Sequence, residues 1–211
     1  MKNTSNLQIE IVIATRNLGK MDEMSKMLPN SVYKPLSLEQ VRVFEEVEET
    51  GTTFKENAIL KAETYGKLAG RLTLADDSGI EVDALGGLPG IYSARYGGDG
   101  KNDNDRNRLL LSNLNGLPEG ELTARFRCVV ALWNPIDDTV VTFEGKIEGR
   151  ITRNAKGRNG FGYDPIFFFP EKNRTLAELS SQEKESVSHR GEAMREAITY
   201  MEENVFSLRG D

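Results

Sequence analysis

The chain has 211 residues, 38% of them hydrophobic, and is therefore long enough to bury one substantial core or two lobes that share a sheet. Its formal net charge of −6 argues against a protein that coats DNA or RNA, because that task leaves a basic surface. The single cysteine, Cys128, excludes an internal disulfide and lies in an apolar run, which favours a buried structural thiol over a nucleophile. Neither a signal peptide nor a membrane span is expected, so the sequence predicts a cytoplasmic protein.

The first third of the chain predicts two strand-to-helix transitions. Residues 9–14 indicate a strand, residues 15–20 a polar loop, and apolar residues at helical spacing follow over 21–28. A helix is predicted over 53–69, because Thr53 and Glu56 fit a capping box and apolar residues then recur every three or four positions. Asn57 and Lys61 are four residues apart, so they share one side of this helix and can point into one pocket.

The remaining segments mix strands with helices. Residues 86–90 are too rich in glycine and proline for a regular element, and a helix is expected around 108–111. Strands are predicted over 123–133 and 139–148 with a hairpin between them, and a short buried strand over 166–169. A final amphipathic helix includes 193–201. This intermixing predicts an α/β fold with a mixed sheet and a cleft where the polar loops gather.

The most informative segment is Asp76-Asp77-Ser78-Gly79, which follows the apolar run 72–75. We expect the strand to end in a Ser-Gly turn here, with Gly79 letting the backbone bend, so that both carboxylates enter one cleft. Mg²⁺ is typically held by one or two carboxylates plus substrate phosphates, which points to phosphate-ester or phosphoanhydride chemistry. The alternative is that both aspartates are ordinary turn formers.

Two further segments suit phosphate and metal binding. The loop 15–20 places Thr15, Asn17 and Lys20 before a helix, where backbone N–H groups and the helix dipole favour anions, although it lacks the glycine spacing of a Walker loop. The acidic run 45–49 is most simply a solvated face. The Thr50-Gly51 turn nevertheless gives its last carboxylate a defined position, as a metal ligand requires.

Two later segments suit a planar base. Glycines bracket Phe161, so a base can approach the backbone and stack on the ring, unless this is only a glycine-rich turn with a core phenylalanine. Ser188 can cap a helix while Lys184, His189 and Arg190 offer hydrogen-bond donors, which suits a ligand rich in carbonyl or phosphate oxygens. The alternative for the sole histidine is a structural role.

Six motifs in chain order together resemble the inosine/xanthosine triphosphate pyrophosphatase family: residues 15–20, 56–62, 75–79, 86–96, 160–165 and 188–191. The resemblance implies one two-lobed α/β domain over 1–211, with a long mixed sheet and an active-site cleft between the lobes. It further implies a homodimer that hydrolyses deaminated purine nucleoside triphosphates (ITP, dITP and XTP) to monophosphate and pyrophosphate with Mg²⁺, which cleanses the nucleotide pool.

The resemblance also implies residue roles. Glu49 and Asp77 would bind the metal, Asp77 would also act as base toward water, and Asp76 and Lys61 would support that site. Substrate contacts are implied for Thr15, Arg16, Asn17, Leu18, Gly19, Lys20, Ser78, Phe161, Gly162, Tyr163, Asp164, Lys184, His189 and Arg190. Two alternatives stay open: Glu48 could replace Glu49 as the ligand, and Arg16 either meets the phosphates or faces solvent.

We expect the base pocket to offer donors alone, which would favour purines with a 6-oxo group and reject adenine, whose 6-amino group is itself a donor. One rival hypothesis is a related pyrophosphatase that acts on pyrimidine or modified nucleotides. Another is a nucleotide-binding regulatory module without turnover, which would leave the carboxylates without a purpose. A metal-dependent nuclease is disfavoured by the net charge. Neither nucleic acid nor a membrane is expected as a partner.

Overall fold

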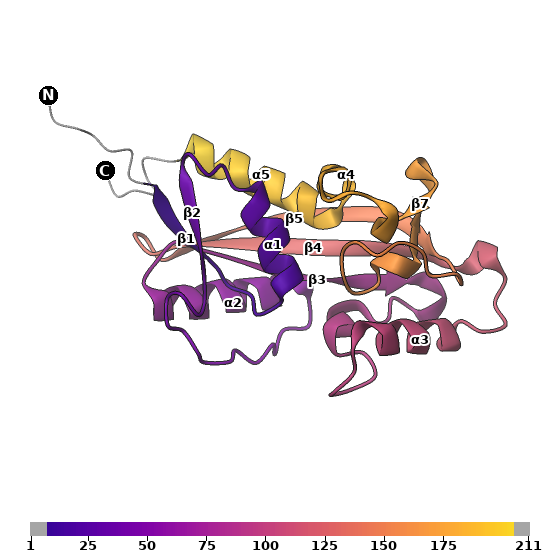
Figure 1. Cartoon of the computed structure of the whole chain (residues 1–211). Helices are drawn as coiled ribbons and strands as arrows, with labels where there is room; N and C mark the ends of the chain where they lie inside the picture. Colours follow the sequence, from indigo (N-terminus) through magenta and orange to yellow (C-terminus); the bar gives the residue numbers. More distant parts are fainter. Residues whose placement is uncertain (1–7, 205–211) are drawn as a thin grey trace, which may run out of the picture. The chain divides into compact units, whose positions relative to one another are not determined.

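The computed structural model describes residues 8–204 of the chain, whose strands form one seven-stranded mixed sheet flanked by helices (Figure 1). The strands are β1 Ile9–Ile13, β2 Tyr33–Ser37, β3 Thr73–Val82, β4 Thr123–Asn134, β5 Thr139–Ile151, β6 Phe167–Phe169 and β7 Arg174–Thr175. The α-helices are α1 Leu18–Met27, α2 Phe54–Ala69, α3 Asp103–Asn113, α4 Ser181–Val187 and α5 His189–Glu203. The predicted α/β fold with a mixed sheet is confirmed.

The sheet has the strand order β2-β1-β3-β4-β5-β6-β7. At one end β1 pairs in parallel with both β2 and β3, with Ile9 opposite Tyr33 and Val12 opposite Thr73. At the other end β6 pairs antiparallel with β5 and with β7. Parallel pairs need crossover connections, which α1 and α2 supply, whereas a tight turn at 135–138 is enough to join β4 to β5.

The chain divides into two compact units. The described part of the first unit consists of residues 8–77, 129–143 and 193–204, and the second consists of 78–128 and 144–192. The strands β3, β4 and β5 each contribute residues to both units. One peptide bond, between Asp77 and Ser78, therefore joins the two units within β3.

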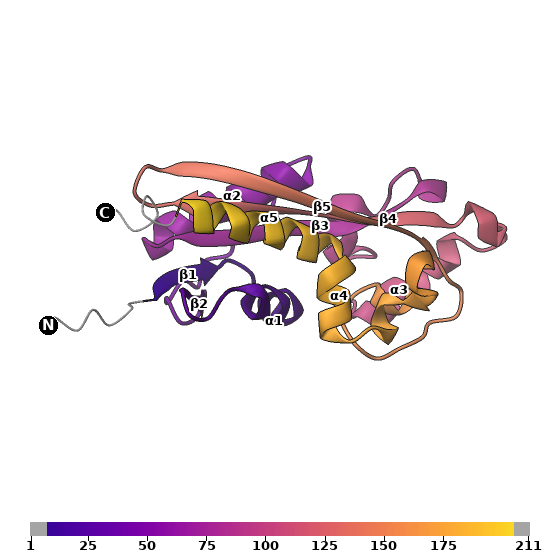
Figure 2. The same cartoon turned by 90° about the horizontal axis from the view of Figure 1, so that it is seen from above.

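The core of the first unit surrounds β1, whose residues 11–13 are fully buried. Figure 1 shows α2 and α5 on opposite sides of β4 and β5, and Figure 2 shows α1 beside β1 and β2. On the α2 side, Gly66 lies against the Trp133 indole, and on the α5 side the rings of Phe143 and Tyr200 are 5.5 Å apart. The two helices thus pack against β4 and β5 from opposite sides.

The helix predicted over 53–69 is confirmed as α2, with one refinement at its start. Thr53 is the N-cap and its side chain accepts a hydrogen bond from the Glu56 N–H. The Glu56 carboxylate, however, accepts from the N–H and hydroxyl of Thr52 rather than closing a reciprocal box with Thr53. At the other end Gly70 adopts a left-handed conformation, with a φ of 60°, and ends the helix.

The turn predicted at 76–79 is wrong. β3 continues from Thr73 to Val82 without interruption, and Gly79 is a buried strand residue. The backbone of the continuing strand is held from outside, because the Ile80 N–H donates to the Ser93 hydroxyl at 2.9 Å. This contact with a residue 13 positions away could not be inferred from the local sequence around Gly79.

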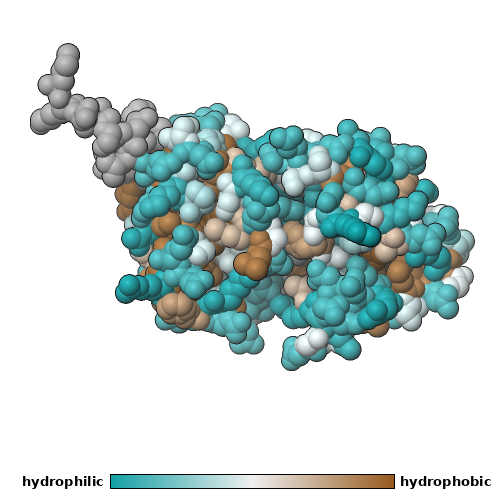
Figure 3. Space-filling view, viewed as in Figure 1, coloured by the Kyte–Doolittle hydropathy of each residue, from teal (hydrophilic) through white to brown (hydrophobic). Residues whose placement is uncertain are grey.

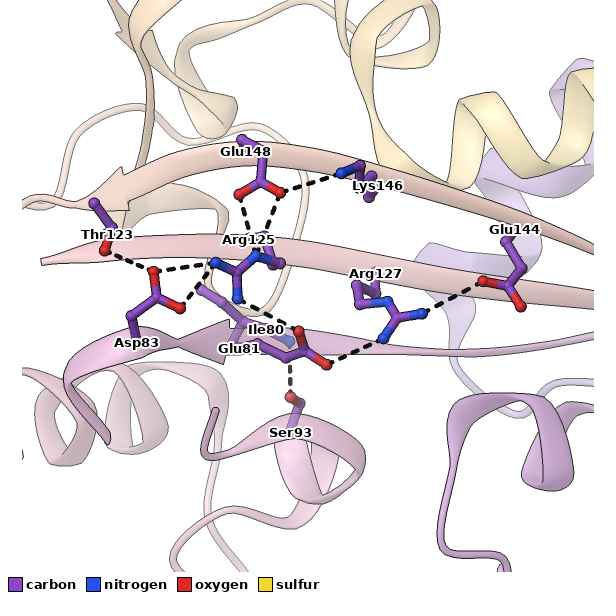
Figure 4. A network of polar contacts seen from close by, with 10 residues as sticks. All are labelled: Ile80, Glu81, Asp83, Ser93, Thr123, Arg125, Arg127, Glu144, Lys146 and Glu148. Atoms are coloured by element: carbon purple, nitrogen blue, oxygen red, sulfur yellow. Dashed lines mark hydrogen bonds and ion pairs between the residues drawn. The ribbon is translucent and has the colours of Figure 1, made fainter. Parts of the chain in front are cut away.

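A charged network crosses β3, β4 and β5 in the second unit (Figure 4). Arg125 lies among three acids, with Nη2 2.8 Å from Asp83 Oδ1, Nε 3.1 Å from Glu148 Oε2 and Nη1 3.7 Å from Glu81 Oε2. Arg127 also contacts Glu81 and extends the network to Glu144. Opposite charges on neighbouring strands favour this pairing over a shifted one. The core beneath includes Ile80, Leu110, Phe126, Ile147 and Phe167.

Hydrophilic residues predominate on the face of the molecule shown in Figure 3. Cys128 is buried, as predicted. Among residues 8–204, no helix has the length and apolar character needed to cross a membrane.

Gly66 yields a test of the packing in the first unit. A Cβ built at this position would lie 2.2 Å from the Trp133 indole, so alanine must displace a buried ring. Alanine normally stabilises a helix interior by about 1 kcal/mol relative to glycine. We expect Gly66→Ala to lower the free energy of unfolding by about 1–3 kcal/mol in a urea titration. Gly120→Ala, where a Cβ meets no atom within 4 Å, is the control and should change little.

Candidate active site

Two lysines from different helices meet adjacent carboxylates of β3 in the first unit. Lys20 Nζ of α1 lies 3.1 Å from Asp76 Oδ2, and Lys61 Nζ of α2 lies 3.1 Å from Asp77 Oδ1. Each aspartate has its own lysine partner, and the two pairs lie near each other, since Lys20 also lowers the pKa of Asp77 and Asp76 also raises the pKa of Lys61. Asp76, Asp77, Lys20 and Lys61 therefore gather as predicted, although they do so on a continuous strand rather than at a turn.

Glu49 joins the Lys61 end of this cluster. Its Oε1 lies 2.6 Å from Lys61 Nζ, whereas Glu48 is exposed. The approach of this segment is fixed by Asn57, whose Oδ1 accepts from the Gly51 N–H at 2.8 Å while its Nδ2 donates to Asp77 Oδ2 at 3.3 Å. A Cβ at Gly51 would lie 2.6 Å from that Asn57 oxygen, so the close approach requires glycine. Of the two glutamates left open by the sequence, the geometry favours Glu49.

Among the described side chains of this cluster, the carboxylates outnumber the lysines. Three carboxylates, Glu49, Asp76 and Asp77, share the positive charges of Lys20 and Lys61. Burial raises the pKa of Asp77, and Glu49 raises it further, against the opposing effect of the two lysines. Burial alone would lower the pKa of Lys61, but the neighbouring carboxylates outweigh that effect and its pKa is raised. Lys61 therefore stays charged, and the site attracts a further cation.

The donor set fits a divalent cation that is bound together with phosphates. Among the described residues, no three His, Cys, Asp or Glu side chains form a group that could hold a metal ion unaided. Glu49 and Asp77 nevertheless contact the same ammonium group, so one cation can reach an oxygen of each. Mg²⁺ commonly takes one or two carboxylates and completes its shell with water and substrate phosphates. These two carboxylates therefore suit Mg²⁺ when a phosphate ligand is present.

The predicted phosphate loop is shorter than expected, because α1 already begins at Leu18. Asn17 is the N-cap, and its Oδ1 accepts from the N–H groups of Gly19 and Lys20 at 2.9 and 3.1 Å. That oxygen occupies the backbone donors on which the prediction relied, so an incoming phosphate would depend on side-chain donors such as Lys20. Arg16 is exposed and donates to the Glu45 carbonyl oxygen at 2.8 Å, without reaching the lysine–carboxylate cluster.

A second set of predicted residues gathers in the second unit around Phe161. Lys184 Nζ and Arg190 Cζ lie 4.8 and 5.5 Å from the centre of its ring, and both side chains are buried. Asp164 pairs with Lys184 and also accepts from the Phe161 N–H at 2.9 Å. Arg190 donates to Ser78 Oγ at 2.8 Å. An aromatic ring accompanied by cations is suited to a planar base that carries carbonyl oxygens.

The expectation of a pocket that offers donors alone is wrong, because the buried Asp164 carboxylate lies among those donors. Its acceptor oxygens partly compensate the Lys184 charge in a site that has little access to water. The pocket therefore combines an acceptor with its donors.

His189 lies under the second set and is held by packing. Its ring stacks on Phe126, with centres 4.7 Å apart and planes 7° from parallel. The predicted cap is confirmed, since Ser188 Oγ accepts from the Gly191 N–H at 3.0 Å. His189 is buried, so its ring plane is set by Phe126 before any ligand binds.

Sequence reasoning missed the two side chains of α3 that hold the loop carrying Phe161. The Gly162 N–H donates to Asp103 Oδ2 at 2.7 Å, and the Gly162 carbonyl accepts from Asn107 Nδ2 at 3.1 Å. A signal was present, because Asn107 shares a helix face with the buried Leu110 and Leu114 at spacings of three and seven. An amide among core leucines indicates a specific partner.

Comparison with known proteins places the chain among related sequences and structures. The model of the Ham1 family matches residues 11–200. A curated relative from Bacillus licheniformis, named dITP/XTP pyrophosphatase, is 47% identical over 92% of this chain and 98% of the relative. One of the same name from Vibrio parahaemolyticus is 49% identical over 88% and 93%. The solved structure of a HAM1 protein from Coxiella burnetii is 42% identical, covers 93% of this chain and all of that one, and has a TM-score of 0.83.

The raised pKa of Asp77 predicts how stability depends on pH. A carboxyl whose folded-state pKa lies above its unfolded value binds protons more tightly in the folded protein, so its contribution to stability falls as pH rises through that interval. With chelator present, we expect Asp77→Asn to be at least as stable as the unaltered chain at pH 7, with the difference vanishing below the ordinary aspartate pKa of 3.8. Thermal melts across pH measure this.

Asp83→Asn is the control of opposite sign. A hydrogen bond from Thr123 and the charge of Arg125 lower the pKa of Asp83, so its charged form stabilises the fold above the ordinary range and this contribution is lost as pH falls. This variant should be less stable than the unaltered chain at pH 7. Marked destabilisation by Asp77→Asn at pH 7 would contradict the assigned electrostatics.

Proposed function

The chain belongs to the Ham1 family, and we propose that it is a pyrophosphatase that hydrolyses deaminated purine nucleoside triphosphates (dITP, ITP and XTP) to the monophosphate and pyrophosphate. The relatives named dITP/XTP pyrophosphatase support this activity. The observation that carries the proposal is the partly buried cluster of Glu49, Asp76 and Asp77 with Lys20 and Lys61, because such a cluster can take a cation and a polyphosphate together.

In this proposal the lysine–carboxylate cluster takes the triphosphate. Lys20, with the hydroxyl of Thr15 and the amide Nδ2 of Asn17, binds phosphate oxygens, and Lys61 neutralises charge beside Asp77. Glu49 and Asp77 would hold Mg²⁺ with the substrate phosphates. Bound there, the ion would supply charge neutralisation and a more acidic water. Asp76 sets the position of Lys20 through its ion pair.

The chemical step is attack of water on the α-phosphorus. Asp77 accepts a proton from the attacking water, a role suited to a carboxylate whose pKa is raised by burial. The water oxygen bonds to the α-phosphorus, the bond from that phosphorus to the bridging oxygen breaks, and the bridging oxygen leaves with pyrophosphate. Lys20 and Lys61 stabilise the charge that builds up on the phosphate oxygens. No covalent intermediate is required, in agreement with the buried position of Cys128.

The residues around Phe161 take the base. Phe161 stacks on the purine, and the Lys184, His189 and Arg190 side chains face its carbonyl oxygens and the sugar. Hypoxanthine and xanthine carry an acceptor at position 6, whereas adenine carries a donor there. Adenine would place its 6-amino donor against the cationic donors of this buried site, so the site should discriminate against it.

The cellular setting follows from the substrate. We place the enzyme in the cytoplasm, where free nucleoside triphosphates occur, and propose that it works as a homodimer on small-molecule substrates without nucleic acid. The net charge of −6 is consistent with the last point. A pyrophosphatase for pyrimidine or modified nucleotides, or a binding module without turnover, would be recognised by the substrate panel below.

The substrate panel is the direct test of the activity. We expect pyrophosphate release from dITP, ITP and XTP in Mg²⁺ to exceed release from ATP and GTP by about 10²-fold or more in kcat/KM, and to stop in chelator. Asp77→Asn, tested for folding as above, should be inactive. Release from pyrimidine triphosphates alone would favour the first rival, and nucleotide binding without release from any substrate would favour the binding module.

Glu49 and Glu48 form a matched pair that tests the metal assignment. Glu49→Gln removes a carboxylate that contacts Lys61, whereas Glu48→Gln removes an exposed neighbour. We expect Glu49→Gln to raise the Mg²⁺ concentration for half-maximal activity about tenfold or more and Glu48→Gln to leave it unchanged. An equal response of the two variants to Mg²⁺, or a larger shift in Glu48→Gln, would remove Glu49 from the metal site.

A further inference from the structure

Two side chains of α3 hold the loop that carries Phe161, one by the N–H and the other by the carbonyl of Gly162. The Gly162 N–H donates to Asp103 Oδ2 at 2.7 Å, and the Gly162 carbonyl accepts from Asn107 Nδ2 at 3.1 Å. Both side chains come from the first turns of α3, which is more than 50 residues earlier in the chain (Figure 1). The contacts are therefore tertiary, and they fix the residue that directly follows the aromatic ring.

A loop of this composition needs such fixing. Gly160 and Gly162 both have positive φ, at 72° and 62°, a region that glycine populates freely. Glycine also loses more backbone freedom on ordering than any other residue, so a loop that orders only on binding would weaken the affinity for its ligand. Ordering the loop in advance removes that cost from the binding step.

Asn107 is poorly explained as a residue that stabilises the fold. The residue is 7% exposed, and its Oδ1 atom is buried without a hydrogen-bond partner among the described residues. An unsatisfied buried acceptor lowers stability, whereas an apolar side chain of similar size on the same face as Leu110 would pack at no such cost. A polar residue that lowers stability where it stands is more readily explained by a functional role.

We propose that Asn107, assisted by Asp103, is a positioning residue that fixes the 160–163 loop and thereby the Phe161 ring, and so sets affinity and selectivity for the base. This inference rests on the proposed function. Asn107 contacts the loop and is not among the residues to which the chemical step is assigned, so we expect its effect in substrate binding and base discrimination, with the chemical step intact. We call Asp103 and Asn107 the clamp. Both lie on α3, and neither belongs to the motif segments 160–165 and 188–191 that the sequence assigns to the base.

The test compares two replacements of the same kind in one helix. Asn107→Leu removes the donor to Gly162 and the unsatisfied oxygen together, and Asn104→Leu places the same side chain at an exposed position of α3 as the control. Asp103→Ala removes the second half of the clamp at an exposed position, where a loss of fold is not expected. Each protein is measured for thermal stability, for steady-state pyrophosphate release, and for binding of inosine monophosphate by calorimetry.

For Asn107→Leu we expect unchanged or higher thermal stability, a KM for dITP raised about five- to twentyfold, inosine monophosphate binding weakened by a similar factor, and kcat within about threefold of the unaltered chain. The preference for dITP over dATP should fall. Asp103→Ala should shift KM in the same direction by a smaller factor, and Asn104→Leu should match the unaltered chain.

Two outcomes would contradict the proposed positioning role of Asn107 and Asp103. One is that Asn107→Leu and Asp103→Ala both keep the KM, the monophosphate affinity and the selectivity of an active unaltered chain. The other is that kcat falls while KM does not change. If Asn107→Leu fails to fold, Asp103→Ala decides by the same criteria. Absence of pyrophosphate release by the unaltered chain contradicts the proposed function instead, so the two failures are distinguishable.

Discussion

The charge balance around Asp76 and Asp77 is the constraint on which the rest of the first unit depends. Two adjacent carboxylates on a buried strand are costly unless cations accompany them, and the fold supplies one from each of two helices. Lys20 comes from the first turn of α1 and Lys61 from the middle of α2. The placement of both helices, the cap at Asn17 and the close approach at Gly51 all serve to bring side chains to β3.

The two lysines of this cluster only partly neutralise the negative charge of its carboxylates. A third carboxylate, Glu49, shares Lys61 with Asp77, and burial further disfavours the charged form of Asp77. A fully neutralised cluster would gain little from a substrate that arrives with a cation. The remaining negative charge attracts the cation that accompanies such a substrate, and the two lysines pair with its phosphates at the same place.

The sequence predicted elements well where a pattern is local, and less well where a distant residue decides. The run from Thr53 to Gly70 carries its own cap, periodicity and C-terminal glycine, and α2 follows it closely. The turn predicted at Gly79 fails because Ser93 and the neighbouring strands hold β3 extended beyond it. Residue type still identified the candidate site, because two adjacent buried carboxylates need neighbouring cations whether they lie in a turn or in a strand. Asn107 was missed because its partner lies 55 residues away.

The uninterrupted course of β3 limits which mutations this segment of the protein can tolerate. The ion pairs of Asp76 and Asp77 depend on the register of this strand, and Ser78 follows directly with its contact to Arg190. An in-frame deletion or insertion of a single codon between Thr73 and Asp76 would move every later side chain of β3 to the opposite face of the strand. Point substitutions can drift around this segment over time, but length variation within it should be purged by selection.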